Sequence, residues 1–226
     1  FTYKGFFSKE KAKQEYESLK EKGLDVELGT AKAWSTLGWF KDPILSEILK
    51  DEPGKIARLI IHELTHGTLY IKDSVEYNEN LATFVGDQGS VLFLKYKYGV
   101  ESKEMRDYIG HISDVHKYSD HILKGLDSLK ALYANASFQQ LDTAAKNIKK
   151  NQLMHDILQR ADTISFYDKS KFKKLLSPDF KVNNTFFLTY MTYHQEQNIF
   201  EEEFKTKFNS DFKKYLAYLK GRYSSL

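Results

Sequence analysis

The chain has 226 residues, with 34 basic and 31 acidic side chains and a formal net charge of +3, so it is long enough for one large domain or two small ones. The balanced charge argues against nucleic-acid binding, because proteins that bind nucleic acid usually carry a concentrated basic excess. The absence of cysteine excludes disulfides and thiolate metal sites. No run of residues approaches the roughly 18 apolar residues of a membrane span.

Residues 1–40 contain one predicted helix and all of the strand signal. The helix is predicted from Ser8, a suitable N-cap, to Lys22, which precedes a glycine. Residues 25–29 alternate polar and apolar side chains, which predicts a short strand. Residues 31–40, rich in small and aromatic side chains, are a second candidate strand. Together these segments predict a small N-terminal β-sheet.

Two helices with proline or glycine at their boundaries are predicted next. Asp42 and the proline after it suit the start of a short helix that ends near Lys50. Residues 51–54 then interrupt the chain with a Pro-Gly pair. The following helix, over residues 55–70, is apolar nearly all round, as expected for a helix inside a protein.

Helical periodicity continues to the C-terminus. A second buried helix is expected to begin between Glu76 and Glu79. Apolar residues from Met105 to Leu132 recur every three or four positions, which predicts a long amphipathic helix. Further helices are expected over residues 138–161, after Asn183 or Asn184 as cap, and over residues 201–223.

Residues 62–66 read His-Glu-Leu-Thr-His, the HExxH pattern. Positions i and i+4 share one face of a helix, so His62 and His66 can both reach one metal ion. Glu63 is then the predicted general base, which accepts a proton from a metal-bound water. Burying two histidines and a glutamate in an apolar helix is unfavourable unless a partner satisfies them. The segment therefore predicts a zinc site, with structural histidines as the less favoured alternative.

A catalytic zinc takes three protein ligands and a water, and two histidines with a glutamate is a known set. Glu79 is the predicted third ligand, because the apolar residues 81–85 follow it and place it on a buried element. Glu76 is the competitor and Asp73 a more remote one. Asn78 and Thr83 are candidates to orient the imidazoles. The alternative for Asn78 is a helix cap, and the alternative for Thr83 is a hydroxyl in the core.

Several strings of residues resemble the bacterial putative aminopeptidase family of gluzincin-like metallopeptidases. Residues 33–45 (AWSTLGWFKDPIL) are similar to its STLGWF-DP signature, and HELTH at 62–66 follows in the family's order. Residues 77–85 are similar to its NE-x-x-A-T segment, and residues 183–184 with 192–193 resemble its NNA…TY segment. The resemblance implies a zinc metallopeptidase with a zincin-like fold and, more narrowly, an aminopeptidase.

The resemblance also implies where a substrate would bind. In zincins the peptide commonly lies antiparallel to an edge strand beside the metal-binding helix. The residues predicted to form this substrate-binding edge strand are Trp34, Ser35, Thr36, Leu37 and Gly38. The alternative is that they form an ordinary strand of the core. Asn183 and Asn184 are predicted to bind substrate as well. Tyr193 and His194 are candidates to stabilise the oxyanion, with Tyr193 favoured and a buried packing tyrosine as its alternative.

We therefore expect an α+β, zincin-like fold and a single catalytic domain over residues 1–226. In it, residues 1–100 form a small N-terminal sheet beside the HExxH helix, and residues 101–226 form a mostly helical part. The expected function is zinc-dependent hydrolysis of peptide or protein substrates. The alternatives are a catalytically silent zincin-fold binding or scaffold protein, against which the intact Glu63 argues, and a zinc endopeptidase that acts on proteins.

The chain begins at Phe1 rather than at a methionine, which suggests that an upstream segment has been removed. Members of the resembling family often carry a lipoprotein-type signal in that region. The resemblance therefore implies a location in the cell envelope or outside the cytoplasm.

Overall fold

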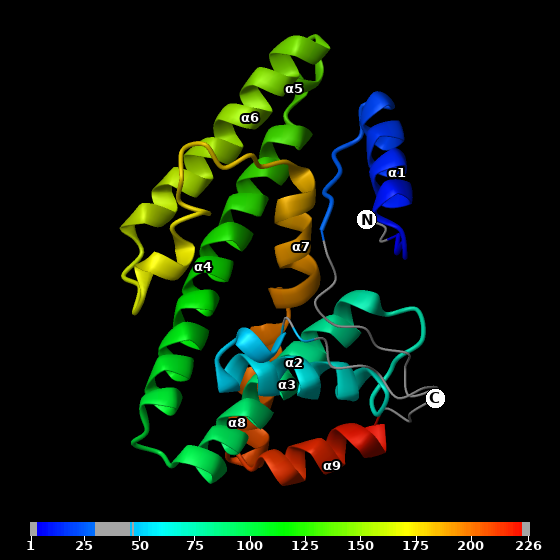
Figure 1. The fold of residues 1–226 in the computed structure, drawn as a ribbon. Coiled ribbons are helices and arrows are strands. Elements are labelled where there is room, and N and C mark those ends of the chain that lie inside the picture. The colour runs from blue at the N-terminus through cyan, green and yellow to red at the C-terminus, as the bar shows by residue number, and fades with distance from the viewer. Residues whose placement is uncertain (1–3, 30–45, 47, 223–226) are drawn as a thin grey trace. The chain divides into compact units, whose positions relative to one another are not determined.

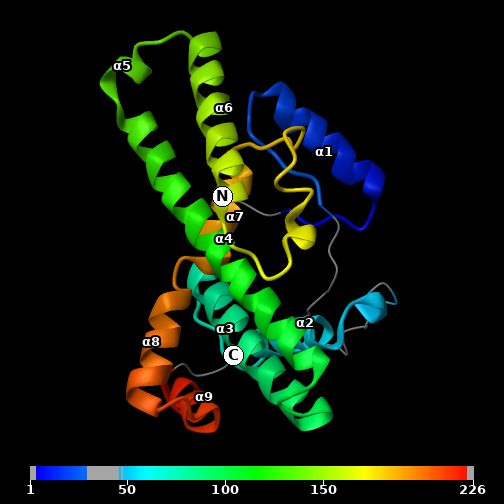
Figure 2. The ribbon, with the colours of Figure 1, turned by 90° about the vertical axis from the view of Figure 1, so that its left-hand side faces the viewer.

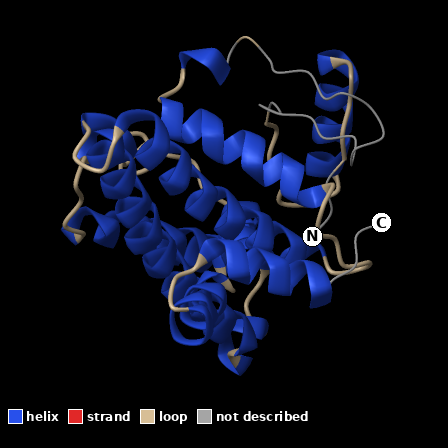
Figure 3. Ribbon diagram, turned by 90° about the horizontal axis from the view of Figure 1, so that it is seen from below, coloured by secondary structure: helices blue, strands red, loops and turns tan. Residues whose placement is uncertain are grey.

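The computed structural model describes residues 4–29, 46 and 48–222, and all regular secondary structure in this part of the chain is helical (Figures 1 and 3). None of these helices is both long and apolar enough to cross a membrane. Three short 3-10 turns are η1 (Ile48–Lys50), η2 (Ala161–Thr163) and η3 (Lys169–Phe172). The α-helices are α1 (Lys9–Glu21), α2 (Pro53–His66), α3 (Val75–Tyr98), α4 (Lys103–Ala134), α5 (Ala136–Gln139), α6 (Thr143–Arg160), α7 (Asn184–His194), α8 (Gln197–Phe208) and α9 (Phe212–Arg222).

The predicted α+β class with an N-terminal sheet is wrong, because the described residues contain no β-strand. Residues 25–29 have no regular secondary structure, and side chains bind two of their carbonyl groups. Asn183 Nδ2 donates to the Val26 carbonyl at 3.0 Å, and Thr185 Oγ1 donates to the carbonyl of residue 25 at 3.1 Å. The second candidate strand, residues 31–40, lies outside the described residues.

The helices differ from the predicted pattern most clearly near the C-terminus. The single helix expected over residues 201–223 is two helices, α8 and α9. Asn209 and Ser210 separate them with positive φ angles of 48° and 57°, a backbone conformation that ends a helix. The Asn209 N–H donates to the Phe204 carbonyl and so closes the last turn of α8.

The described chain forms two compact units. The first comprises residues 4–29 and 114–191, and the second comprises residues 46, 48–113 and 192–222. Helices α4 and α7 each contribute residues to both units. Two compact units can belong to one domain or to two, so a single catalytic domain over 1–226 stays a prediction.

In the first unit, α6 packs along the C-terminal part of α4 (Figure 2). Gly125 of α4 makes this approach close, because a Cβ there would lie 2.4 Å from Cγ2 of Ile157. Around this contact the core gathers fully buried apolar side chains from α4, α6 and α7. They include Tyr118, Ile122, Leu129, Met154, Leu158 and Phe187.

In the second unit, α3 is the central helix. One part of its surface packs against α2, and another carries Leu81, Phe84 and Val85 into a core with α8 and α9. The Phe84 ring contacts the rings of Phe204 and Tyr215 with centroids 5.5 and 5.6 Å apart, in edge-to-face geometry. The aromatic core holds α3 in place, and α3 carries the predicted third ligand.

Candidate metal centre and active site

The HExxH residues occupy the last turns of α2. The helix begins with Pro53 at its first turn, where proline has no hydrogen bond to lose. Its C-terminal turns place His62 and His66 one turn apart, as their spacing predicts. Both histidines are buried, each 8% exposed.

Small residues on α3 allow α2 to come close. A Cβ at Gly86 would lie 3.0 Å from the Arg58 carbonyl oxygen and 3.4 Å from the His62 Cβ. A Cβ at Gly89 would lie 2.8 Å from Cδ1 of Ile61. The glycines therefore set a backbone separation that a larger residue would increase. This separation governs how closely His62 approaches the side chains of α3.

An ion pair joins the same two helices one turn from His62. Arg58 Nε donates to Asp87 Oδ1 at 2.6 Å, and the Tyr108 hydroxyl donates to the same oxygen at 3.4 Å. Burial would lower the pKa of Arg58, but the Asp87 carboxylate outweighs it and raises that pKa. Burial also raises the pKa of Tyr108 well above its usual range. Arg58 and Tyr108 therefore keep their protons, and Asp87 keeps its two donors.

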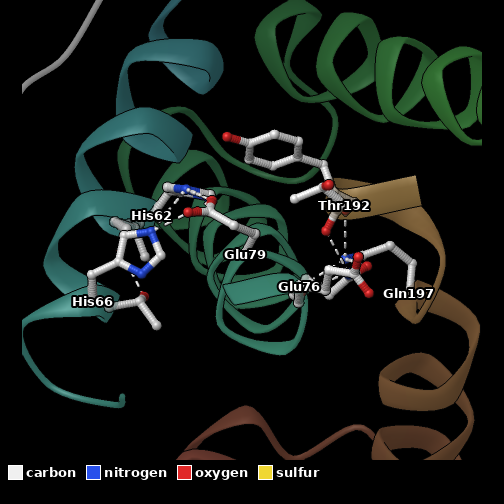
Figure 4. Close-up of polar contacts among 10 residues, drawn as sticks. His62, His66, Glu76, Glu79, Thr192 and Gln197 are labelled. Atoms are coloured by element: carbon white, nitrogen blue, oxygen red, sulfur yellow. Dashed lines mark hydrogen bonds and ion pairs between the residues drawn. The ribbon is translucent and has the colours of Figure 1, made fainter. Parts of the chain in front are cut away.

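The structure brings His62, His66 and Glu79 together at the interface of α2 and α3 (Figure 4). The two Nε2 atoms lie 3.3 Å apart. Glu79 Oε2 lies 3.3 Å from the Nε2 of His62 and 3.7 Å from that of His66. The imidazole rings meet nearly edge to face, at 85°. Three potential ligand atoms thus converge on one point.

These separations fit a tetrahedral metal ion. Donor atoms about 2.0–2.2 Å from one tetrahedral zinc are separated from each other by about 3.3–3.6 Å. Two of the three observed separations, both 3.3 Å, lie in this range, and the third, 3.7 Å, lies just beyond it. Among the described residues, no other group of three His, Cys, Asp or Glu side chains has comparable geometry. The residues present therefore fit zinc in both donor chemistry and spacing.

Glu79 is ionised in this arrangement. Burial would raise the pKa of its carboxyl, but hydrogen bonds with His62 and His66 outweigh burial and lower the pKa to about 2. An ionised carboxylate beside two imidazoles is the state that metal binding requires. Glu76, the predicted competitor, is exposed and lies outside the group, as does Asp73.

Asn78 anchors the connection between α2 and α3. Its Oδ1 accepts from the Ile71 N–H at 2.8 Å, and its Nδ2 donates to the Ile71 carbonyl at 2.7 Å. Both ends of the Asn78 amide, which is the predicted candidate to orient an imidazole, are therefore bound to Ile71. The Nδ1 of His62 is buried with no hydrogen-bond partner among the described residues. Asn78 therefore fixes the backbone just before Glu79 and does not bind the His62 ring.

Asn80, on the other side of Glu79, was missed as a site residue by sequence reasoning. It is fully buried, and its Nδ2 donates to the Thr192 carbonyl at 2.7 Å and to the Glu76 carbonyl at 2.8 Å. Its Oδ1 accepts from the Glu196 N–H at 3.0 Å. The signal was a second asparagine in the string Asn78-Glu79-Asn80, in which Asn78 and Glu79 were given roles and Asn80 was not.

Tyr193 and His194 lie at the C-terminal end of α7, and both are half-buried. The Tyr193 carbonyl accepts from Gln197 Nε2 at 3.2 Å. Figure 4 shows Thr192 and Gln197 beside the first turn of α3, near Glu76. The described segment therefore places the backbone of both oxyanion candidates next to the helix that carries Glu79. Their roles stay predictions.

The predicted substrate-binding residues are placed differently. Trp34, Ser35, Thr36, Leu37 and Gly38 all lie outside the described residues. Asn183 and Asn184 belong to the first unit, where they bind the N-terminal segment. Asn184 Nδ2 donates to Asp25 Oδ2 at 2.7 Å, and its Oδ1 accepts from the Tyr133 hydroxyl at 2.6 Å. These contacts give the two asparagines a structural role, and substrate binding by them stays a prediction.

Comparison with models of known protein families gives a match to this chain. The model of the family described as "Putative aminopeptidase" matches residues 1–222. Neither the curated proteins nor the solved structures that were compared gave a match. Because the family model spans nearly the whole chain, including both helices of the candidate metal centre, the protein belongs to the putative aminopeptidase family.

Proposed function

We propose that this protein is a zinc-dependent peptidase in which His62, His66 and Glu79 hold the ion. The convergence of two imidazole nitrogens and one carboxylate oxygen, 3.3–3.7 Å apart, is the observation that carries the proposal. Two histidines with a glutamate is a ligand set that leaves a zinc coordination position open for catalysis. Membership of the putative aminopeptidase family supports peptide hydrolysis as the reaction.

Other residues of the chain are proposed to act as the general base and as the donor to the oxyanion. Zinc, when bound, supplies a Lewis acid and lowers the pKa of a coordinated water to about 7. Glu63 follows His62 directly on α2 and is half-buried, so it suits the general base that takes a proton from the attacking water. Tyr193 is the favoured donor to the oxyanion that develops on the substrate carbonyl, with His194 as the alternative.

The narrower proposal is an aminopeptidase, which acts on peptides with a free α-amino group. The family description supports it. A zinc endopeptidase would cleave peptides whether or not their N-terminus is free. A catalytically silent binding protein would hold zinc and cleave nothing.

One experiment separates these functions. The zinc-loaded protein is incubated with a panel of peptides, each prepared with a free and with an acetylated N-terminus, and the products are identified by mass spectrometry. An aminopeptidase releases N-terminal residues from the free forms alone. Cleavage of both forms indicates an endopeptidase, and zinc binding without cleavage indicates a binding protein.

The matched control is Glu63→Gln. It keeps the size of the side chain and removes its basicity. We expect this variant to retain zinc and fold while losing about 10²- to 10⁴-fold in rate, which is the usual contribution of a general base. Equal cleavage by the variant and the wild type would contradict the role given to Glu63.

A further inference from the structure

We propose that Asn80 is a positioning residue, which aligns the Tyr193–His194 end of α7 with the metal ligand Glu79. This inference rests on the proposed peptidase function. Asn80 follows Glu79 directly, and its side-chain amide donates to the carbonyl of Thr192, the residue before Tyr193. One fully buried side chain therefore joins the two parts of the site that sequence separates by more than a hundred residues.

The hydrogen bonds determine how the Asn80 amide is oriented. The Glu76 and Thr192 carbonyls can only accept, so both must face its Nδ2. The Glu196 N–H can only donate, so it must face Oδ1. Gln197 Nε2 also donates to Oδ1, at 3.2 Å. A rotated amide would therefore lose four bonds in a buried place, where unpaired polar groups are unfavourable. The contact therefore specifies one alignment of α3 with the α7–α8 junction.

Gln197 adds a second connection across the same junction. Its Nε2 donates to the Asn80 main-chain carbonyl at 2.7 Å and lies 3.2 Å from the Tyr193 carbonyl. The Thr192 carbonyl is thus bound by Asn80 directly, and the Tyr193 carbonyl is connected to Asn80 through Gln197. An apolar side chain of similar size would fill the same volume but would not fix this alignment.

The position of the Tyr193–His194 segment relative to Glu79 should affect the reaction rate more than it affects zinc binding. Displacing a catalytic group by about 1 Å can lower a rate by about 10²-fold. Because Asn80 ligates nothing in this proposal, its loss should leave His62, His66 and Glu79 able to bind zinc. The expected signature is therefore a lower kcat with zinc content retained.

The test compares Asn80→Ala and Gln197→Leu with a control that only destabilises the same unit. Leu219→Ala is that control, since Leu219 is buried in the core of α3, α8 and α9. All variants are loaded with zinc and assayed, per folded molecule, on the peptide that the wild type cleaves fastest. We expect kcat to fall about 10- to 100-fold in Asn80→Ala, in the range for a displaced catalytic group. Gln197→Leu should show a smaller loss, and Leu219→Ala should keep the wild-type kcat.

Double-mutant cycles test whether Asn80 acts through the α7 residues. Asn80→Ala is combined with Tyr193→Phe and, separately, with His194→Ala. Residues that act through one network give non-additive effects, typically equivalent to about two- to hundredfold. Coupling with either partner supports the inference and identifies the residue that Asn80 positions. Additive effects with both partners would overturn it.

Hydrogen exchange gives a readout that does not depend on activity. The Glu196 amide donates to Asn80 Oδ1, so Asn80→Ala should speed exchange over residues 192–197 while leaving α2 unchanged. Unchanged exchange over 192–197, or a kcat equal to that of the wild type, would overturn the inference alone. Absence of any cleavage by the zinc-loaded wild type would overturn the proposed function as well.

Discussion

The close approach of α2 to α3 predicts that a glycine-to-alanine substitution has different effects on stability at different positions. Gly86 and Gly89 lie at this contact, whereas Gly221 lies in α9 with no neighbour near its Cβ position. Glycine in a helix is less favourable than alanine by about 0.5–1 kcal/mol. Gly221 in α9 has open space where a Cβ would project, so Gly221→Ala should stabilise by up to about 1 kcal/mol. At Gly89 the new Cβ would lie 2.8 Å from the tip of the Ile61 side chain. A rotamer adjustment there costs about 0.5–1.5 kcal/mol, so the net effect should be near zero.

Gly86→Ala meets backbone instead of a flexible side chain. Its Cβ would lie 3.0 Å from the Arg58 carbonyl oxygen and 3.4 Å from the His62 Cβ. Either α2 or α3 must move by a few tenths of an ångström, and overpacking of this kind costs about 1–3 kcal/mol. After the gain in helix propensity, we expect net destabilisation of about 1 kcal/mol.

The same displacement should weaken zinc binding, because it separates His62 from Glu79. We expect a loss of about 10- to 100-fold in affinity, the range seen when support around a metal ligand is disturbed. Stability is measured by denaturant unfolding with chelator present, so that zinc does not contribute, and affinity by competition with a chelating dye. If Gly86→Ala is as stabilising as Gly221→Ala and binds zinc like the wild type, the reasoning from helix separation is refuted.

Three further predictions concern the metal centre. Glu79→Ala should lower zinc content from about one ion per chain, whereas Glu76→Ala should retain it, and metal analysis of both variants decides between the two carboxylates. Tyr193→Phe should lower kcat about 10²- to 10³-fold with zinc content unchanged, and a loss confined to His194→Ala would transfer the oxyanion role to the histidine. Chelation should lower the melting temperature, since a ligand at about 100 times its Kd stabilises a fold by about 2.7 kcal/mol, and an unchanged melting temperature would argue against the site.

Some features follow from the sequence because their causes are local. A helix repeats every 3.6 residues, so the spacing of His62 and His66 already places them on one face. The long amphipathic helix α4 was predicted for the same reason, and residues 105–132 lie within Lys103–Ala134. The choice of Glu79 as third ligand rested on the apolar run after it, and the structure brings this carboxylate to the histidines.

Other features depend on partners far away in the sequence. A strand exists only if another strand pairs with it, and the alternation over residues 25–29 could not show that the side chains of Asn183 and Thr185 would bind this backbone. The break at Asn209 depends on a left-handed conformation that helical periodicity does not reveal. A strand predicted from the pattern of one segment can therefore be wrong, because the segment does not show whether a second strand pairs with it.

The sequence by itself determined the chemistry available to this protein, namely two imidazoles and nearby carboxylates on helices, because residue identity and helical repeat are local properties. The sequence favoured Glu79 as the third ligand, but only the tertiary structure shows that this carboxylate lies beside the two histidines and which contacts hold it there. Gly86 sets the separation of two helices, and Asn80 binds a carbonyl 112 positions away. Both depend on packing between segments that come together only when the chain folds, which is the physical reason that sequence reasoning overlooked them.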